Sequence, residues 1–223
     1  MMDKSASTTP CSESLPRACT IPMESVGIPV GFFARDPRDV APALLGKWLL
    51  REDGERLTGG LIVETEAYLA AHDPACHAAV GLNRKNKSMF GPAGRAYVYV
   101  IHGSSCLNVV TDEEGLGSAV LIRALEPRCG IDLMTTRRRG RSGKRELTTG
   151  PGRLCEAMNV TREWDGHDLT SAQRLWIQES DLTAGDLPLR ISERIGVTSG
   201  QDLMLRYLIK GNPYVSGPRR WRL

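Results

Sequence analysis

Aromatic residues and long apolar runs are both scarce in this sequence. Phe, Trp and Tyr together make up 5% of the 223 residues, so a tyrosine that falls inside a polar motif stands out. No run approaches the roughly 18 apolar residues that a membrane-spanning helix needs. The N-terminus also lacks the apolar stretch that follows the first charges of a secretory signal. We therefore expect no membrane partner.

Paired cysteines of the C-x-x-C type are missing as well. The six cysteines are scattered, which argues against a zinc ribbon or a redox motif. Because no secretory signal is present, a reducing compartment and free thiols are expected.

Lysine is the third scarce residue type, since it supplies only 6 of the 29 basic residues and arginine supplies the other 23. The net charge is a mild +3. Guanidinium groups suit bidentate phosphate contacts better than ammonium groups do. This composition favours nucleic acid as a partner, but it is also typical of proteins from GC-rich genomes, so both interpretations stay open.

The pattern along the chain predicts one α+β domain between two tails. Residues 1–30 are rich in Ser, Thr and Pro without periodicity, which indicates a disordered tail. The domain spans 31–217, and 218–223 form a basic C-terminal tail with Arg219, Arg220 and Arg222. Helices are expected over 36–46, 130–138 and 150–160, and strands over 48–52, 57–69, 96–101, 118–127 and 203–211.

The segment VETEAY carries the first candidate site. On a strand, Glu64, Glu66 and Tyr68 share one face. A solvated edge strand is one interpretation, and a general base beside an aromatic platform is the other. Arg123 lies in an apolar run and needs a partner if it is buried. Glu64 or Glu66 would serve, either in a purely structural pair or in a functional one.

Further candidates come from loops and turns. Tyr97 and Tyr99 share a strand face, and His102 follows them at the start of a loop. His72 and His77 flank a DPAC loop, but their spacing alone does not make a metal site, and we predict none. A cluster of basic residues after 136, together with the Gly-rich turn before 154, suits phosphates, although a solvated loop would look the same. The candidates for phosphate contacts are Arg137, Arg138, Arg139, Arg141, Lys144, Arg145 and Arg153.

Taken in order, the motifs resemble those of the alkyladenine DNA glycosylase family, also called 3-methyladenine or methylpurine DNA glycosylases. The matching segments cover about 32–217 and include GLIVETEAYL, KNKSMFGPAG, YVYVIHG, AVLIRALEP, LTTGPGRLCEAM and LRYLIKGNPYVS. The resemblance implies a single compact α+β domain, in which helices flank a curved antiparallel sheet. It also implies a monofunctional base-excision repair enzyme that flips a damaged purine out of duplex DNA and hydrolyses its N-glycosidic bond, leaving an abasic site.

The resemblance further implies a monomer with no cofactor or metal, whose partner is double-stranded DNA with damaged purines. Candidate lesions are 3-methyladenine, 7-methylguanine, ethenoadenine and hypoxanthine. The expected location is cytoplasmic, with the nucleoid in a bacterium, or nuclear in a eukaryote. No lysine lies in VETEAY or YVY, so a Schiff-base lyase step is not expected.

Site roles follow from the resemblance residue by residue. Glu66 matches the general base that activates water, and Tyr68 and Tyr99 match the two stacking walls. The other pocket residues are His77, Asn108 and Arg123. His102 stands where the family usually has a tyrosine wedge, and the segment after it is one residue shorter than usual.

Two other functions remain as alternatives. One is a non-catalytic nucleic-acid-binding module, which would have no use for Glu66. The other is a sugar glycosidase that uses Glu64 and Glu66 as its acid pair, since residues two apart on a strand lie roughly 6.5–7 Å apart. Two side chains that project in parallel from one strand would not flank a bond, however, and the basic loops argue against a neutral sugar.

Overall fold

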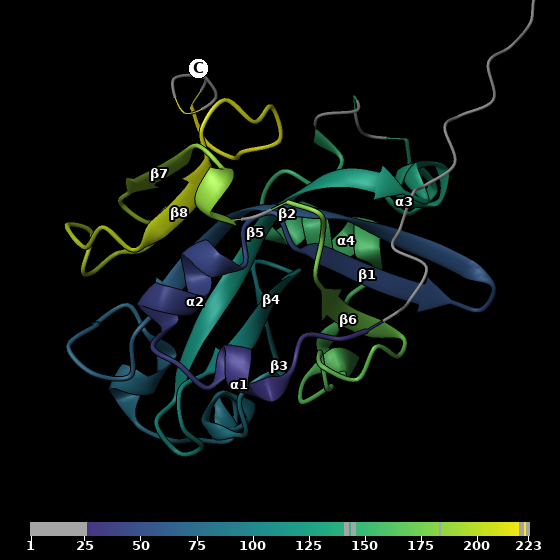
Figure 1. Cartoon of the computed structure of the whole chain (residues 1–223). Helices are drawn as coiled ribbons and strands as arrows, with labels where there is room; N and C mark the ends of the chain where they lie inside the picture. Colours follow the sequence, from purple (N-terminus) through teal and green to yellow (C-terminus); the bar gives the residue numbers. More distant parts are fainter. Residues whose placement is uncertain (1–25, 141–142, 144–145, 183, 219–220, 222–223) are drawn as a thin grey trace, which may run out of the picture.

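A curled antiparallel sheet forms the centre of the molecule (Figure 1). The structure is a computed structural model that describes residues 26–140, 143, 146–182, 184–218 and 221. The sheet bends into a half-barrel within one domain, and short helices lie against it. This arrangement confirms the expected α+β class and the curved antiparallel sheet.

Eight strands make up the sheet within the described residues. They are β1 (Trp48–Asp53), β2 (Arg56–Tyr68), β3 (Ala96–Ile101), β4 (Ser104–Thr111), β5 (Ser118–Cys129), β6 (Leu175–Gln178), β7 (Leu189–Ser192) and β8 (Arg206–Ile209). Six of them follow the order β3-β4-β5-β2-β1-β6, while β8 pairs with both β2 and β7. The long strand β2 is therefore bordered along its second half by β5 on one side and β8 on the other.

The helices are short. They are α1 (Val30–Phe33), α2 (Pro37–Ala43), α3 (Ile131–Arg137) and α4 (Pro151–Met158), with 3-10 turns η1 (His77–Val80), η2 (Lys87–Phe90), η4 (Arg162–Trp164) and η5 (Ala184–Asp186). Asp36 caps α2 by accepting a hydrogen bond from the Arg38 backbone N–H at 2.8 Å. Pro37 occupies the first helical position, where its missing N–H costs nothing.

The main core lies between the sheet and the helices that cover it. α2 packs against β2, β5 and β8, and α4 packs against β4 and β5. Their contact residues, such as Val40 and Leu154, are fully buried beside Val63 and Ile122 of the sheet. The elements that carry the chemistry-bearing motifs thus rest on one packed core.

Every expected helix and strand is present, although most begin or end one to a few residues away from the expected bounds. The sequence did not predict β4, β6 or β7. The first of these is hidden because Ser104, Ser105 and Asn108 interrupt its apolar alternation. The predicted helix over 36–46 ends at Ala43, with Pro42 inside its last turn.

The folded part begins earlier than residue 31. Gly27 bridges Gln178 of β6, and Ile28 is 1% exposed in the main core. The disorder expected for residues 1–25 lies outside the described residues, as do Arg219, Arg220 and Arg222. Among the helices that the structure describes, none is long and apolar enough to cross a membrane.

Candidate active site

The two carboxylates of VETEAY are completely buried. Glu64 and Glu66 are both 0% exposed, because β2 is bordered by β5 and β8 at this point. The interpretation of this face as a solvated edge is therefore wrong. In the pairing of β2 with β5, Glu64 faces Ala124 and Thr65 faces Ile122, so Arg123 is the extra residue of a β-bulge. A bulge re-aims a side chain, and here it brings the guanidinium to the carboxylates.

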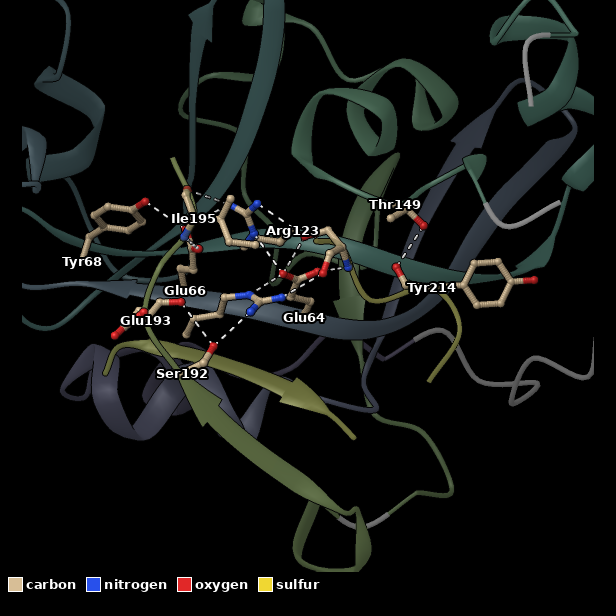
Figure 2. A network of polar contacts seen from close by, with 11 residues as sticks. Glu64, Glu66, Tyr68, Arg123, Thr149, Ser192, Glu193, Ile195 and Tyr214 are labelled. Carbon is tan, nitrogen blue, oxygen red and sulfur yellow. Dashed lines mark hydrogen bonds and ion pairs between the residues drawn. The ribbon is translucent and has the colours of Figure 1, made fainter. Parts of the chain in front are cut away.

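Arg123 binds both carboxylates at once (Figure 2). Its Nε donates to Glu64 Oε1 at 3.1 Å, and its Nη1 donates to Glu66 Oε2 at 3.1 Å. Nη1 also lies 3.5 Å from the Ile195 carbonyl oxygen. The sequence required a carboxylate partner for a buried Arg123, and both Glu64 and Glu66 fill that role.

Glu66 is held from two further directions. The Tyr68 hydroxyl donates to Oε2 at 3.0 Å, and the Ile195 backbone N–H donates to Oε1 at 2.8 Å. Burial and the Glu66 charge raise the pKa of Tyr68, so the phenol keeps its proton and stays a donor. These contacts fix the orientation of the Glu66 carboxylate.

Glu64 has a different environment. It accepts from Arg206 Nε at 2.6 Å and from the Ser216 backbone N–H and hydroxyl at 2.7 and 2.8 Å. Burial alone would raise the pKa of Glu64, but Arg123, Arg206 and Ser216 outweigh it, and the net direction is downward. A glycosidase general acid needs a raised pKa, so Glu64 does not fit that role.

A cavity of about 210 Å³ opens beside Tyr68. Four residues predicted for the pocket line it: Tyr68 from β2, His77 from η1, Tyr99 from β3 and Asn108 from β4. The rest of the lining is Pro74, Ala75, Met89, Tyr97, Ile101 and residues 196–199. Glu66 and Arg123, by contrast, do not line the cavity.

Aromatic contacts order the far wall of the cavity. His77 Nδ1 lies 2.7 Å from the Tyr97 hydroxyl, and its ring meets Tyr99 edge to face at 4.6 Å. Burial against these rings lowers the pKa of His77, which favours a neutral imidazole. Asn108 stands opposite Tyr97 in the sheet, and its amide nitrogen donates to the Tyr97 carbonyl at 2.9 Å.

The tip of the β3–β4 hairpin is a two-residue turn. His102 and Gly103 have φ angles of +49° and +76°, a pattern typical of the type I′ turns that suit twisted hairpins. The strands pair without a break from Ala96 and Val109 to Ile101 and Ser104. The shortened segment therefore does not disturb the register of the hairpin. His102 is exposed at this tip.

The predicted phosphate-binding residues fall into three groups. Arg137 and Arg138 are in ion pairs, with Asp53 at 2.8 Å and with Glu156. Arg139 is exposed, and so is Arg153, which has only a 3.8 Å contact to Glu146. Arg141, Lys144 and Arg145 lie outside the described residues. Phosphate binding stays a prediction for all of them.

Sequence reasoning missed two sets of residues around the cavity. A hollow of about 650 Å³ adjoins it and contains Arg84, Lys85 and Arg162. The signal for Arg84 and Lys85 in the sequence is the run of basic residues in GLNRKNK. Behind Tyr68 lie Arg194, which no local motif marked, and Asp73, which is the first residue of the DPAC loop. No group of three potential metal ligands occurs in the part of the chain that the structure describes.

A comparison with protein families shows which family this chain belongs to. The family model for methylpurine-DNA glycosylase matches residues 31–213. The chain belongs to this family. The resemblance drawn from the motifs is confirmed, and the chain is a DNA glycosylase, a hydrolase of N-glycosidic bonds.

Relatives of the methylpurine-DNA glycosylase family match along most of their length. A protein from Koribacter versatilis is 45% identical over 200 residues, which cover 86% of this chain and 94% of the relative. One from Carboxydothermus hydrogenoformans is 46% identical over 190 residues, covering 85% and 98%. Both are provisionally named 3-methyladenine DNA glycosylases.

Proposed function

We propose that this enzyme is monofunctional, takes a damaged purine from duplex DNA into the cavity, and hydrolyses its N-glycosidic bond with water activated by Glu66. The observation that carries the proposal is a fixed carboxylate directly behind an aromatic cavity. Tyr68 belongs to both, because its ring lines the cavity and its hydroxyl binds Glu66. A non-catalytic DNA-binding module would not need that connection.

The cavity suits a flipped base. A base must leave the stack before an enzyme can act on it, at a cost of a few kcal/mol. Tyr68 and Tyr99 offer aromatic walls that repay part of this cost by stacking. Alkylation makes a purine cationic, and a cation between aromatic rings gains about 0.5–2 kcal/mol. Burial lowers the pKa of His77 and so favours the neutral ring, which does not repel such a base.

The water would be handled by Glu66 and its neighbours. Arg123 Nη1 lies near both Glu66 Oε2 and the Ile195 carbonyl, so a carboxylate, a guanidinium and a carbonyl converge on one point. The carboxylate then takes a proton from water and offsets the positive charge that develops on the sugar. General base catalysis of this kind contributes about 10²–10⁴-fold.

The path of the DNA strand is proposed from exposed groups around the cavity mouth. His102 at the hairpin tip would fill the gap that the flipped nucleotide leaves. Arg84 and Lys85 beside the cavity, and Arg139 and Arg153 beyond the hairpin, would contact phosphates. One chain supplies the complete site, which supports action as a monomer. The place of action would be the DNA-containing compartment, cytoplasmic in a bacterium and nuclear in a eukaryote.

The proposed first substrate is 3-methyladenine, with 7-methylguanine, ethenoadenine and hypoxanthine as further candidates. The test is single-turnover release of base from methylated DNA and from duplexes that carry one neutral lesion each, scored before and after alkali. Base release with strand breaks only after alkali supports a monofunctional glycosylase. Strand breaks without alkali would contradict the monofunctional assignment. No release from any substrate, with DNA binding intact, would favour the binding module.

A further inference from the structure

A buried ion pair lies behind the Tyr68 wall of the cavity. Arg194 Nη1 and Nη2 each donate to one oxygen of Asp73 at 2.7 Å, and both side chains are 0% exposed. Arg194 Nη1 also donates to the Ala67 carbonyl at 3.0 Å. Arg194 lies in the segment that joins β7 to β8, far along the chain from Tyr68.

The guanidinium lies against the face of Tyr68 that is turned away from the cavity. Arg194 Cζ is 4.6 Å from the centroid of the Tyr68 ring. Arg194 is buried and takes no part in lining the cavity, whereas Tyr68 does line it. The ring therefore separates a fixed positive charge from the space where the base would stack.

Asp73 connects this charge to the rest of the pocket. Besides Arg194, it accepts from the Leu69 and Ala75 backbone N–H groups at 3.0 and 3.1 Å, and Ala75 lines the cavity. Burial by itself would raise the pKa of Asp73, but these donors outweigh it and the pKa is lowered. Both members of the pair are thus charged, and the guanidinium is the member that lies over the ring.

We propose that Arg194 is a specificity-determining residue that disfavours cationic purines relative to neutral ones. An aromatic face attracts a cation because its π-electrons carry negative charge. A guanidinium fixed on the opposite face draws that density away and repels a second cation across the ring. Asp73 offsets part of this charge, but the group placed over the ring is the guanidinium. The wall then favours alkylated bases less strongly than two tyrosines alone would, and excision of neutral lesions stays competitive.

This inference rests on the proposed function, and its test is a ratio of rates. Release of 3-methyladenine from methylated DNA is measured beside release of ethenoadenine from a duplex, both in single turnover. The double variant Arg194→Met with Asp73→Asn removes both charges while keeping similar volumes. It is expected to raise the cationic-to-neutral ratio by about twofold to thirtyfold, the range of a cation–π interaction. A folding defect lowers both rates together and leaves this ratio unchanged.

Two further variants keep the test decisive if the double variant does not fold. Arg194→Gln keeps a donor for Asp73 without the charge, and its ratio is expected to rise as well. Arg194→Lys keeps the charge, and its ratio is expected to stay near that of the wild type. The control pair Lys47→Met with Glu179→Gln removes an ion pair of 2.5 Å that lies away from the cavity, and it should leave the ratio unchanged.

The outcomes separate this inference from the proposed function. A wild type that releases both bases, with an unchanged ratio in the double variant and in Arg194→Gln, overturns the role of Arg194 and leaves the proposed function standing. A wild type that releases neither base overturns the proposed function and this inference with it. A raised ratio in the double variant and in Arg194→Gln, with a wild-type ratio in Arg194→Lys, supports the assignment.

Discussion

Arg123 Nη1 donates to Glu66 Oε2 at 3.1 Å while its Nε binds Glu64 at the same distance. One guanidinium therefore joins the proposed general base to a second carboxylate, Glu64, which also binds Arg206 and Ser216. Arg206 completes the cluster through Glu64, so two carboxylates face two guanidinium groups in a buried setting. The opposite charges offset the free-energy cost of removing these groups from water.

Removal of Arg123 is expected to destabilise the fold strongly. Arg123→Met leaves two buried carboxylates with one guanidinium, and loss of one partner of a buried pair costs about 3–5 kcal/mol. The measurement is the free energy of unfolding in urea. Arg38→Met, which breaks the exposed pair with Asp36, is the control and should change stability little. Equal stabilities for the two variants would show that the cluster does not act as described.

The stability of the protein is expected to fall more steeply in mild acid because of His77. Burial lowers the pKa of His77 below its ordinary value of 6.5, so the unfolded chain binds this proton more readily than the folded one. Above pH 6.5 the ring is neutral in both states and does not reduce the free energy of unfolding. As the pH falls below 6.5, the unfolded chain takes up the proton first, and the free energy of unfolding decreases. His77→Gln should flatten the pH dependence of unfolding in that range. An unchanged slope would show that His77 does not contribute.

His102 is expected to act on base flipping without acting on the fold. Its side chain is exposed at the hairpin tip, and Gly103 supplies the second left-handed position of the turn. His102→Ala should weaken binding to lesion DNA and slow base release severalfold, with an unchanged melting temperature. His102→Tyr, the residue usual in the family, should speed release. If alanine leaves both binding and release unaffected, the wedge role is wrong.

Salt dependence should separate phosphate-binding arginines and lysines from structural ones. Each lost phosphate contact lowers the slope of log K against log salt by about 0.9. Lys85→Ala, at an exposed position beside the cavity, should show that change. Arg137→Ala should instead lower the thermal stability, because Arg137 binds Asp53 and the Ala157 carbonyl. DNA-binding isotherms over a salt series test both, and the reverse pattern would contradict the proposed strand path.

Local patterns predicted much of the fold. The alternation in VETEAY and in AYVYVI placed Glu66, Tyr68, Tyr97 and Tyr99 on strands, and Asp36 with Pro37 marked a helix start. The sequence pattern did not predict β4, because its polar residues belong to the site and the turn and interrupt the apolar alternation. The bulge at Arg123 also leaves no mark in the sequence, since it arises only when β2 and β5 pair.

The support behind the cavity depends on contacts between distant segments. Arg194 reaches Asp73 across 121 residues, and Ser216 reaches Glu64 across 152. Neither contact has a local signature, because an arginine or serine in a loop resembles any solvated residue. The basic run after residue 136 shows the opposite case, since its local pattern suggested free cations while tertiary contacts pair Arg137 and Arg138 with acids.

The most direct test of the account is base release by Glu66→Gln. Glutamine keeps the shape of the side chain but cannot take a proton from water. We expect single-turnover release of 3-methyladenine to slow by at least about 100-fold, while affinity for lesion DNA and the folded fraction stay near those of the wild type. Glu55→Gln, at the exposed β1–β2 turn, is the matched control and should retain full activity. Release by Glu66→Gln at the wild-type rate would contradict the assignment of Glu66 as the general base.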